Sequence, residues 1–384
     1  MRVAGNRLLL VPVMAVALNA WPQQTRIGGF LAAPDERLLT EAYFPEGFYL
    51  TSPSDVPREI PARAPDPAEA AVIEKAKQVF ARTSLKAIAL LDGEHVLWTA
   101  YKEPARPATR FSGYSLGKTV TAMTVGHAIC EGKLKSTTEA GELVPELRET
   151  GYEKVTVAHL LTMSSGIKDG SYHAAGTPKT QEKIRQVHAG QAQWRDLLPL
   201  VNQKQTGFLG KPLEAGESFE YKEMDAFVLG LMVQAAAGQP LSKYMESTLF
   251  KSVGVEGPVA LREDRFKTTY APTVARMTLP DWTRFAAWVR KQEAQAGCIG
   301  DFVRAATRTQ VANKSNVGFN LHRGYGYFVW TDNPRHRDSY WAWGFGGQRI
   351  AWNHSNGRML VVFSSLENNV EEVYGLYRDW AALP

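Results

Sequence analysis

The sequence predicts an α+β fold in which an antiparallel sheet with flanking helices is built from both ends of the chain. Strand-like runs occur early, at 85–101, and late, at 324–331, 348–353 and 359–366. Residues 135–240 carry helical patterns and loops with little strand signal. The strand runs are short and separated by turns, which favours antiparallel pairing. We therefore expect one sheet from the two chain ends, with a helical region inserted between them.

The first predicted helix starts at residue 67. Asp66 is a typical N-cap, Pro67 suits the first helical turn, and Glu69 completes a capping box. The apolar residues that follow recur at helical spacing and form one face: Val72, Ile73, Ala76, Val79 and Phe80.

Turn and capping signals define three further elements. The apolar runs on either side of Asp92-Gly93 predict a β-hairpin. Residues 116–131 predict a helix that is apolar nearly all round and ends at Gly132, and such a helix belongs in the centre of a fold. A helical pattern over 369–382 closes the chain.

The N-terminal segment has the layout of a secretory signal peptide. Arg2 and Arg7 accompany an apolar run over 8–18, and the run contains Ala15-Val16-Ala17 as a small-x-small cleavage site. The run is short for a membrane span. Residues 1–20 therefore predict export to the periplasm or beyond, with an uncleaved inner-membrane anchor as the alternative.

The rest of the chain divides into two parts. Residues 21–66 are rich in proline and predict an arm that packs on the main body. Residues 67–384 then form the main domain, with a helical subdomain at about 135–240. Membrane association is expected through the N-terminal segment only.

Composition excludes several classes of partner. The net charge is +5, from 44 Lys and Arg against 39 Asp and Glu, and no basic run is dense enough to predict nucleic-acid binding. The eight histidines show no zinc-type spacing, so no metal site is predicted.

The two cysteines are Cys130 and Cys298. Export permits a disulfide, but Cys130 falls in an apolar helix, where a buried free thiol is expected.

One serine carries two nucleophile signatures. The stretch GYSLGK, residues 113–118, matches G-x-S-x-G and also S-x-x-K, both centred on Ser115. The first pattern needs a buried strand before the serine and an acid and a histidine after it. The preceding EPARPATRFSGY contains two prolines and two arginines, and the nominated His354 lies in a turn-like NHSNG. We therefore favour S-x-x-K.

The S-x-x-K interpretation fits its surroundings. Ser115 lies at a helix start, and Lys118 follows one turn later on the same face. A serine nucleophile needs a base within hydrogen-bond reach. Burial and the positive end of the helix disfavour the charged form of the lysine, so that Lys118 can act as that base. The helix start also directs backbone N–H groups towards an oxyanion.

Three longer segments resemble the serine β-lactamase-like superfamily. FSGYSLGKTVTAMTVGHAICEGKL (111–134) is followed by VTVAHLLTMSSGI (155–167), then AGESFEYKEMDAFVLGLMVQAAAG (215–238) and WAWGFGGQRIAW (341–352). Within the superfamily, the chain resembles the branch of class C β-lactamases, family VIII esterases and 6-aminohexanoate-dimer hydrolases. The resemblance extends over roughly residues 70–384 and implies a helical region over the active site.

The resemblance implies roles for particular residues. Ser115 would be the nucleophile and Lys118 its base. Tyr221 would protonate the leaving group and then activate water. The third segment would run as an edge strand, and its backbone N–H near Phe345, beside Gly346, would complete the oxyanion hole with that of Ser115.

Two departures from the family pattern bear on the substrate. Tyr-x-Asn, usual in penicillin-handling relatives, is replaced by Tyr221-Lys222-Glu223, and Lys-Thr-Gly by Ala342-Trp343-Gly344. We list Glu223 as a substrate-binding residue that accepts a hydrogen bond or pairs with a cation. Tyr172 lies close to the place where the aminohexanoate hydrolases contact the amide, and the resemblance makes it a second candidate substrate-binding residue.

These observations predict an exported serine hydrolase that cleaves an ester or amide of a small molecule through an acyl-enzyme, without a cofactor. Two alternatives stay open. One is a non-catalytic scaffold or peptide-binding protein on the same fold. The other is a D-Ala-D-Ala carboxypeptidase or β-lactamase, which both departures weaken.

Overall fold

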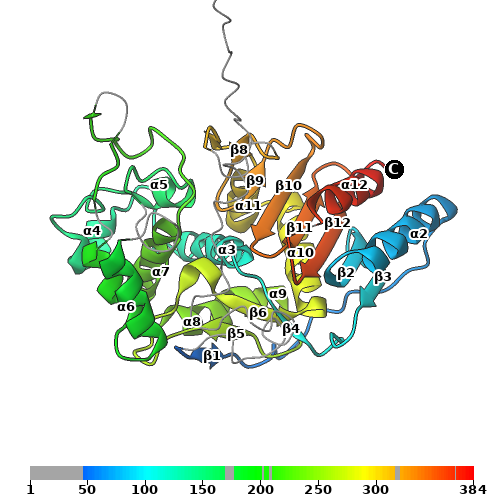
Figure 1. The fold of residues 1–384 in the computed structure, drawn as a ribbon, viewed down its shortest axis with the longest axis horizontal. Helices are drawn as coiled ribbons and strands as arrows, with labels where there is room; N and C mark the ends of the chain where they lie inside the picture. The colour runs from blue at the N-terminus through cyan, green and yellow to red at the C-terminus, as the bar shows by residue number, and fades with distance from the viewer. Residues whose placement is uncertain (1–45, 169–176, 201–202, 207–209, 316–320, 368) are drawn as a thin grey trace, which may run out of the picture.

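An eight-stranded antiparallel sheet with helices on both faces forms the right-hand part of the molecule in Figure 1. The computed structural model describes residues 46–168, 177–200, 203–206, 210–315, 321–367 and 369–384. The strand order is β3-β2-β12-β11-β10-β9-β8-β7. The strands are β2 (Leu85–Asp92), β3 (His95–Tyr101), β7 (Val311–Ala312), β8 (Gly324–Tyr325), β9 (Trp330–Thr331), β10 (Ser339–Gly344), β11 (Gln348–Asn353) and β12 (Arg358–Ser364). The predicted α+β class is therefore confirmed, and β2 from the N-terminal half pairs with β12 from the C-terminal end.

A second, four-stranded sheet lies at the lower edge of Figure 1 and was not predicted. Its order is β1-β5-β6-β4, and its strands are β1 (Phe48–Leu50), β4 (Arg110–Ser112), β5 (Ala260–Arg262) and β6 (Ala275–Thr278). These strands have at most four residues each, too few for a clear alternating pattern. Through β1, the described end of the proline-rich arm hydrogen-bonds to the main body.

The helices divide between the sheet and a separate helical part on the left of Figure 1. Those next to the large sheet are α2 (Pro67–Arg82), α3 (Leu116–Cys130), α10 (Leu279–Ala294), α11 (Cys298–Ala306) and α12 (Val370–Ala381). The left-hand and lower part contains α4 (Ala140–Leu143), α5 (Val157–Leu161), α6 (Pro178–His188), α7 (Glu223–Ala237) and α8 (Leu241–Met245), whereas the short α9 (Lys251–Val253) lies near the middle and contacts α10. The predicted capping box of α2 is confirmed: Asp66 accepts from the Glu69 N–H, and Glu69 accepts from the Asp66 N–H.

Neighbouring residues on β10 show how the sheet is covered on both faces. Tyr340 stacks on Trp352, whose Nε1 donates to the Ala286 carbonyl of α10 at 2.9 Å. Trp341 stacks on Tyr374 of α12. Successive strand side chains point to opposite faces, so α10 and α12 cover opposite sides of the sheet, and its strands are apolar on both faces.

Two strand predictions in the last third of the chain are wrong in detail. Residues 324–331 form two short strands joined by a tight turn, with the Gly326 N–H donating to Val329 O at 2.8 Å, and not one continuous strand. The third segment is not an edge strand. It folds into the β10–β11 hairpin, and β9 covers the outer side of β10 through the pair Trp341–Trp330.

The expectation of a free Cys130 is also wrong. Cys130 and Cys298 form a disulfide across a sequence separation of 168 residues, with their Cα atoms 5.7 Å apart. The bond joins the last residue of α3 to the first residue of α11. Proximity of this kind depends on the packing of α11 against α3, which cysteine spacing does not reveal.

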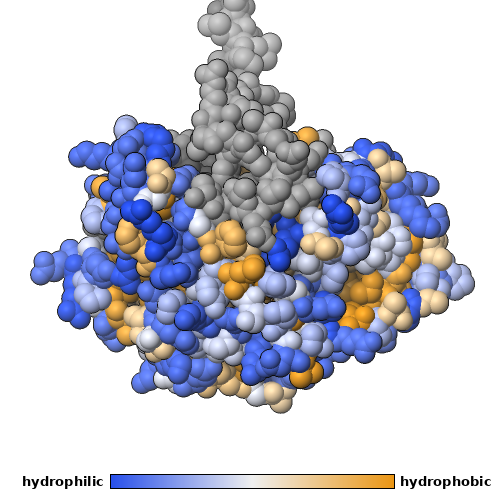
Figure 2. All heavy atoms as spheres, turned by 90° about the horizontal axis from the view of Figure 1, so that it is seen from below, coloured by the Kyte–Doolittle hydropathy of each residue, from blue (hydrophilic) through white to orange (hydrophobic). Residues whose placement is uncertain are grey.

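The exposed surface is mainly polar. The face shown in Figure 2 is mostly hydrophilic, with hydrophobic residues in separate patches. Large hydrophobic residues with substantial exposure in the described chain are Phe48, Leu50, Val56, Phe266 and Leu366. Scattered apolar residues of this kind are ordinary on globular proteins. Among the described residues, no helix combines the length and apolarity needed to cross a membrane.

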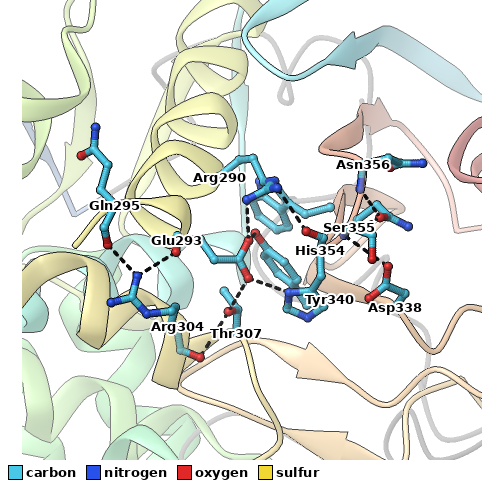
Figure 3. A network of polar contacts seen from close by, with 12 residues as sticks. Arg290, Glu293, Gln295, Arg304, Thr307, Asp338, Tyr340, His354, Ser355 and Asn356 are labelled. Atoms are coloured by element: carbon cyan, nitrogen blue, oxygen red, sulfur yellow. Dashed lines mark hydrogen bonds and ion pairs between the residues drawn. The ribbon is translucent and has the colours of Figure 1, made fainter. Parts of the chain in front are cut away.

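A polar network ties the end of α10 to the sheet at the β11–β12 turn (Figure 3). The Glu293 carboxylate accepts from Tyr340 Oη at 3.0 Å and Thr307 Oγ1 at 3.1 Å, and it pairs with His354 Nδ1 at 2.6 Å and Arg290 Nη1 at 3.3 Å. Burial by itself raises the pKa of Glu293. The hydrogen bond and charge of His354, aided by Arg290 and Tyr340, outweigh burial and leave the pKa below its ordinary value.

We expect Glu293→Gln to lower the free energy of unfolding by about 1–3 kcal/mol at pH 7, since it weakens several buried hydrogen bonds at once. A carboxylate whose pKa is depressed in the folded state contributes stability above its unfolded pKa, and this is lost as pH falls through the folded pKa. Urea unfolding between pH 7 and 3 checks this prediction. The difference between wild type and variant should narrow below pH 4.5, the ordinary Glu pKa, and a constant difference would contradict it.

Candidate active site

A tight turn between β4 and α3 presents Ser115 at the start of the central helix. Tyr114 adopts φ +47°, a left-handed conformation that is unusual for a bulky residue. Ser115 is the N-cap residue of α3, but its side chain makes no capping hydrogen bond. Its Oγ instead accepts a hydrogen bond from Lys118 Nζ at 3.1 Å. The predicted Ser115 and Lys118 therefore face each other one turn apart.

Lys118 is almost completely buried, with 1% of its surface exposed. Its Nζ donates to the Pro272 carbonyl at 3.4 Å and lies 3.6 Å from Glu223 Oε1. It also lies 4.9 Å from the centre of the Tyr221 ring. A carboxylate and an aromatic face both favour the cationic form of a lysine. These contacts therefore oppose the effect of burial and of the positive helix end that the sequence predicts for Lys118.

Tyr221 is half-buried and held by aromatic neighbours from β8 and β9. Its ring stacks on Trp330 at 5.3 Å between centroids, and it meets the Tyr325 ring at a right angle at 6.4 Å. Burial, followed by the nearby charges of Tyr221 and Asp225, raises the pKa of Tyr325 well above its usual value, so Tyr325 stays neutral. The sequence indicated only strand character for Trp330 and Tyr325, and gave no signal that they position Tyr221.

The Tyr221-Lys222-Glu223 segment places its two charges in different environments. Lys222 is fully buried, and its Nζ donates to the Ile167 carbonyl at 2.5 Å and pairs with Glu220 at 3.0 Å. Glu223, with 4% of its surface exposed, accepts from Tyr270 Oη at 2.7 Å through Oε2 and faces Lys118 through Oε1. Glu223, which the sequence predicted to bind substrate, therefore contacts Tyr270 and Lys118 of the protein itself.

Asp225 links the second active-site segment to the TMSSGI stretch. Its Oδ1 accepts from Ser165 Oγ at 2.6 Å and from Tyr152 Oη at 2.9 Å, and all three residues are buried. These bonds fix the start of α7, which carries Glu223, against the segment that follows α5. Sequence reasoning missed Asp225 and Tyr270, because nothing in their local sequence distinguishes them from ordinary core polar residues.

The turn of the β10–β11 hairpin lies beside Ser115. A Cβ atom at Gly344 would come within 2.2 Å of the Gly113 carbonyl oxygen, so β10 and the turn that carries Ser115 are in direct backbone contact. The rings of Phe345 and Tyr114 meet edge to face at 5.6 Å. Gly346 lies in the turn itself with φ +77°. The backbone of Phe345 is thereby brought next to the start of α3.

Arg349, whose direction the sequence left open, is engaged by backbone carbonyls of the β10–β11 hairpin and by Glu367. Its side chain is buried, and Nη1 donates to Gly344 O and Gln348 O, each at 2.8 Å. Nη2 pairs with Glu367 at 2.5 Å, and the guanidinium lies 4.4 Å from the Trp343 ring centre. The Arg349 cation is therefore committed to holding the β10–β11 hairpin.

The competing Ser-His-acid arrangement is not assembled. His354 follows β11 at the end opposite to Gln348, which pairs with Gly344. Six residue steps separate His354 from Gln348, which corresponds to about 20 Å along an extended strand. In addition, β4 has only three residues and belongs to the small sheet. Tyr172 lies outside the residues that the structure describes.

Comparisons with known proteins agree with this architecture. The family model described as Beta-lactamase matches residues 76–383. A solved structure of a Bacillus anthracis protein assigned as a 6-aminohexanoate-dimer hydrolase superimposes with a TM-score of 0.73 at 16% identity, covering 92% of this chain and 95% of that one. A β-lactamase/D-alanine carboxypeptidase from Pseudomonas syringae gives 0.61 at 15% identity, covering 83% and 100%. At these identities the superpositions show a shared fold.

Curated relatives match over a shorter stretch. A beta-lactamase from Providencia stuartii is 25% identical over 153 residues, which are 40% of this chain and 34% of that protein. One from Pseudomonas fluorescens is 25% identical over 160 residues, 40% of this chain and 38% of that protein. The aligned part thus spans little more than a third of either relative. The family model, however, matches most of the chain, and the chain therefore belongs to the beta-lactamase family.

Proposed function

We propose that the protein is a serine hydrolase that cleaves a small-molecule ester or amide, with Ser115 as nucleophile. The observation that carries this proposal is the 3.1 Å hydrogen bond between Lys118 Nζ and a Ser115 Oγ that makes no capping bond. An N-cap serine ordinarily uses its hydroxyl to cap its helix. An uncapped hydroxyl held against a buried amine is instead the arrangement of an activated nucleophile.

The reaction proceeds in two acyl-transfer steps. Ser115 Oγ attacks the carbonyl carbon as its proton passes to Lys118, and the carbonyl oxygen becomes an oxyanion. Backbone N–H groups of Ser115 and Phe345 stabilise that charge, which the contact between Gly344 and Gly113 supports. Tyr221 protonates the leaving group. Water, activated by the same tyrosine, then hydrolyses the acyl-enzyme.

The preferred substrates carry no carboxylate near the scissile bond. Penicillin-type substrates need a cation at the third segment, whereas Arg349 is engaged by Gly344, Gln348 and Glu367. Half-buried aromatic side chains lie near Ser115 and Lys118 instead: Tyr114, whose ring meets Phe345, and Tyr221, whose ring lies against Lys118. Such walls suit uncharged acyl groups. An esterase or amidase of the aminohexanoate-hydrolase type is therefore favoured over a β-lactamase or a carboxypeptidase.

The proposal includes export to the periplasm or beyond. The signal-like segment lies outside the described residues, so support comes from the Cys130–Cys298 disulfide. Structural disulfides persist in oxidising compartments and are rare in the cytosol.

One observation favours the second candidate, a non-catalytic scaffold. Glu223 lies 3.6 Å from Lys118 and stabilises its ammonium form, which cannot accept a proton from Ser115. Under this alternative, the ion pair is a structural element of the core and Ser115 is unreactive.

Labelling with a fluorophosphonate probe, followed by intact-mass measurement, tests the two candidates. We expect a single adduct on the wild-type protein and none on Ser115→Ala. An absence of adduct on a folded wild-type protein would favour the scaffold, and equal labelling of both proteins would identify a different serine. A panel of p-nitrophenyl esters and anilides, with a chromogenic cephalosporin beside them, then defines the substrate class.

A further inference from the structure

A buried ion pair lies directly behind the nucleophile. Lys118 and Glu223, with 1% and 4% of their surfaces exposed, are separated by 3.6 Å between Nζ and Oε1. In a buried site an ion pair without net charge is far less costly than a lone charge. A pair that holds one proton in total is therefore favoured over either group charged alone.

We propose that Glu223 is a proton-positioning residue of the reaction, taking a proton from Lys118 so that Lys118 can receive the proton of Ser115. This inference rests on the proposed function. It makes Ser115, Lys118 and Glu223 a relay in which Glu223 acts through the lysine. The same ion pair that suggests an inert scaffold then becomes part of the catalytic machinery.

The proton transfers balance within the site. A proton first moves from Lys118 Nζ to Glu223 Oε1, breaking an N–H bond and forming an O–H bond, which leaves a neutral amine and a neutral acid. The Ser115 proton next moves to Lys118 Nζ as Oγ bonds to the substrate carbonyl carbon, and the C=O electron pair becomes the oxyanion. When the leaving group departs with a proton delivered from Lys118 through Tyr221, Glu223 returns its proton to the lysine.

The groups around Glu223 hold it in position for this transfer. Tyr270 Oη donates to Oε2 at 2.7 Å and leaves Oε1 facing Lys118. Behind Tyr270, the Arg262 guanidinium lies 4.8 Å from its ring centre, and the buried Trp194 ring stacks on it at 4.0 Å. Arg262 also lies 4.9 Å from the Trp194 ring centre, so these two side chains together hold Tyr270 in place.

The other ionisable groups nearby are engaged in different contacts. Asp225, two residues further along α7, accepts from Ser165 and Tyr152. Lys222 is directed to Ile167 O and Glu220. Tyr221 faces Lys118 with its ring and is itself stacked on Trp330. Of the charged side chains described around Lys118, Glu223 is therefore the one whose contacts suit direct proton exchange.

The relay determines which protonation state is active. In the wild type the reactive state has one proton shared by Lys118 and Glu223. The acidic limb of the pH profile, which is the fall in kcat/KM towards low pH, therefore reports the addition of a second proton to this pair. In Glu223→Gln the reactive state has a neutral Lys118. The acidic limb then reports the protonation of a lone lysine, which happens at higher pH than the protonation of a carboxylate paired with a cation.

The test measures kcat/KM against pH from 5 to 10 with a short-chain p-nitrophenyl ester, on the full chain, with product determined by chromatography. We expect Glu223→Gln to move the acidic limb upward by about one to three pH units. At pH values below its own acidic limb, the kcat/KM of Glu223→Gln should be about 10- to 1000-fold lower than that of the wild type, and it should recover in part at alkaline pH. Glu223→Asp keeps a carboxylate. Its acidic limb should therefore lie near the pH of the wild-type limb, with a lower maximum kcat/KM.

Two further variants keep the outcome interpretable. Tyr270→Phe removes the donor to Oε2, and it should move the limb in the same direction by a smaller amount even if Glu223→Gln does not fold. Glu293→Gln removes a buried carboxylate from the separate network of Figure 3 and should leave the limb unchanged.

A uniform loss of activity at all pH values in Glu223→Gln would overturn the relay and leave Glu223 a structural role. A shift of the limb to lower pH would overturn it too, because Glu223 would then only retard the reaction by holding Lys118 charged. If the wild type shows neither turnover nor probe labelling at Ser115, the proposed function itself fails. Wild-type turnover that depends on Ser115, with an unmoved limb in the folded variants, rejects the relay alone.

Discussion

Ser115→Ala is expected to lower kcat/KM for a p-nitrophenyl ester by about 10⁴- to 10⁶-fold, since removal of a serine nucleophile eliminates the acyl-enzyme route. Lys118→Met is expected to lower it by about 10²- to 10⁴-fold, the usual contribution of a positioned base. Both effects follow from the 3.1 Å contact between the two side chains. Because Ser115 and Lys118 act as one unit, the double variant should have a kcat/KM only slightly lower than that of Ser115→Ala.

The chain offers a matched control for the nucleophile. Ser112 lies three residues before Ser115 at the end of β4, and its buried Oγ has no hydrogen-bond partner among the described residues. Ser112→Ala should leave turnover within about twofold of the wild type, because substitutions away from a working contact have small effects. Initial rates and circular dichroism on the wild type and the four variants check the prediction. Wild-type turnover by folded Ser115→Ala or Lys118→Met would refute the assignment.

Gly344→Ala is expected to lower kcat/KM by about 100-fold without removing any functional group. The added Cβ would lie 2.2 Å from Gly113 O and 2.6 Å from Leu116 Cδ1. The Gly113 backbone has no room to retreat, since its own Cα packs against the Trp282 ring and its N–H donates to Ala275 O at 3.1 Å. β10 must therefore move away from the nucleophile turn, and a displacement of about 1 Å at a reacting centre costs this much.

Stability and labelling separate this effect from unfolding. We expect Gly344→Ala to lower the free energy of unfolding by about 1–3 kcal/mol, the usual cost of overpacking, and to slow labelling of Ser115 by the fluorophosphonate. Gly375→Ala is the matched control, because Gly375 lies within α12 and an added Cβ meets nothing within 4 Å. It should keep full activity and gain up to about 1 kcal/mol in stability. Unchanged kcat/KM in Gly344→Ala would show that β10 does not form part of the site.

Features encoded locally could be predicted well. The capping box at Asp66 and Glu69, the hairpin turn at Asp92-Gly93 and the all-round apolar α3 each depend on residues close together in sequence. The approach of Ser115 to Lys118 belongs to the same class, because one helical turn separates them. For such features the local backbone geometry alone sets the distance between the interacting residues.

Errors and omissions concern residues far apart in the chain. Cys130 reaches Cys298 only because α11 packs on α3. β10 is interior because the short strands β9, β8 and β7, which precede it in the chain, cover its outer side, and strands of two residues leave almost no periodic signal. The small sheet was missed for the same reason.

The sequence by itself determined the fold class, the family and the pairing of a serine with a lysine one turn away on a helix. Only the tertiary structure decided what surrounds that pair. It places Glu223 against Lys118, Tyr270 against Glu223, Gly344 against Gly113 and Arg349 against Gly344 O and Glu367. Periodicity, caps and turns act through bonds and neighbouring residues and can be inferred from residue order. The electrostatic environment of a lysine depends on which distant side chains are packed around it, and that is settled only when the whole core assembles.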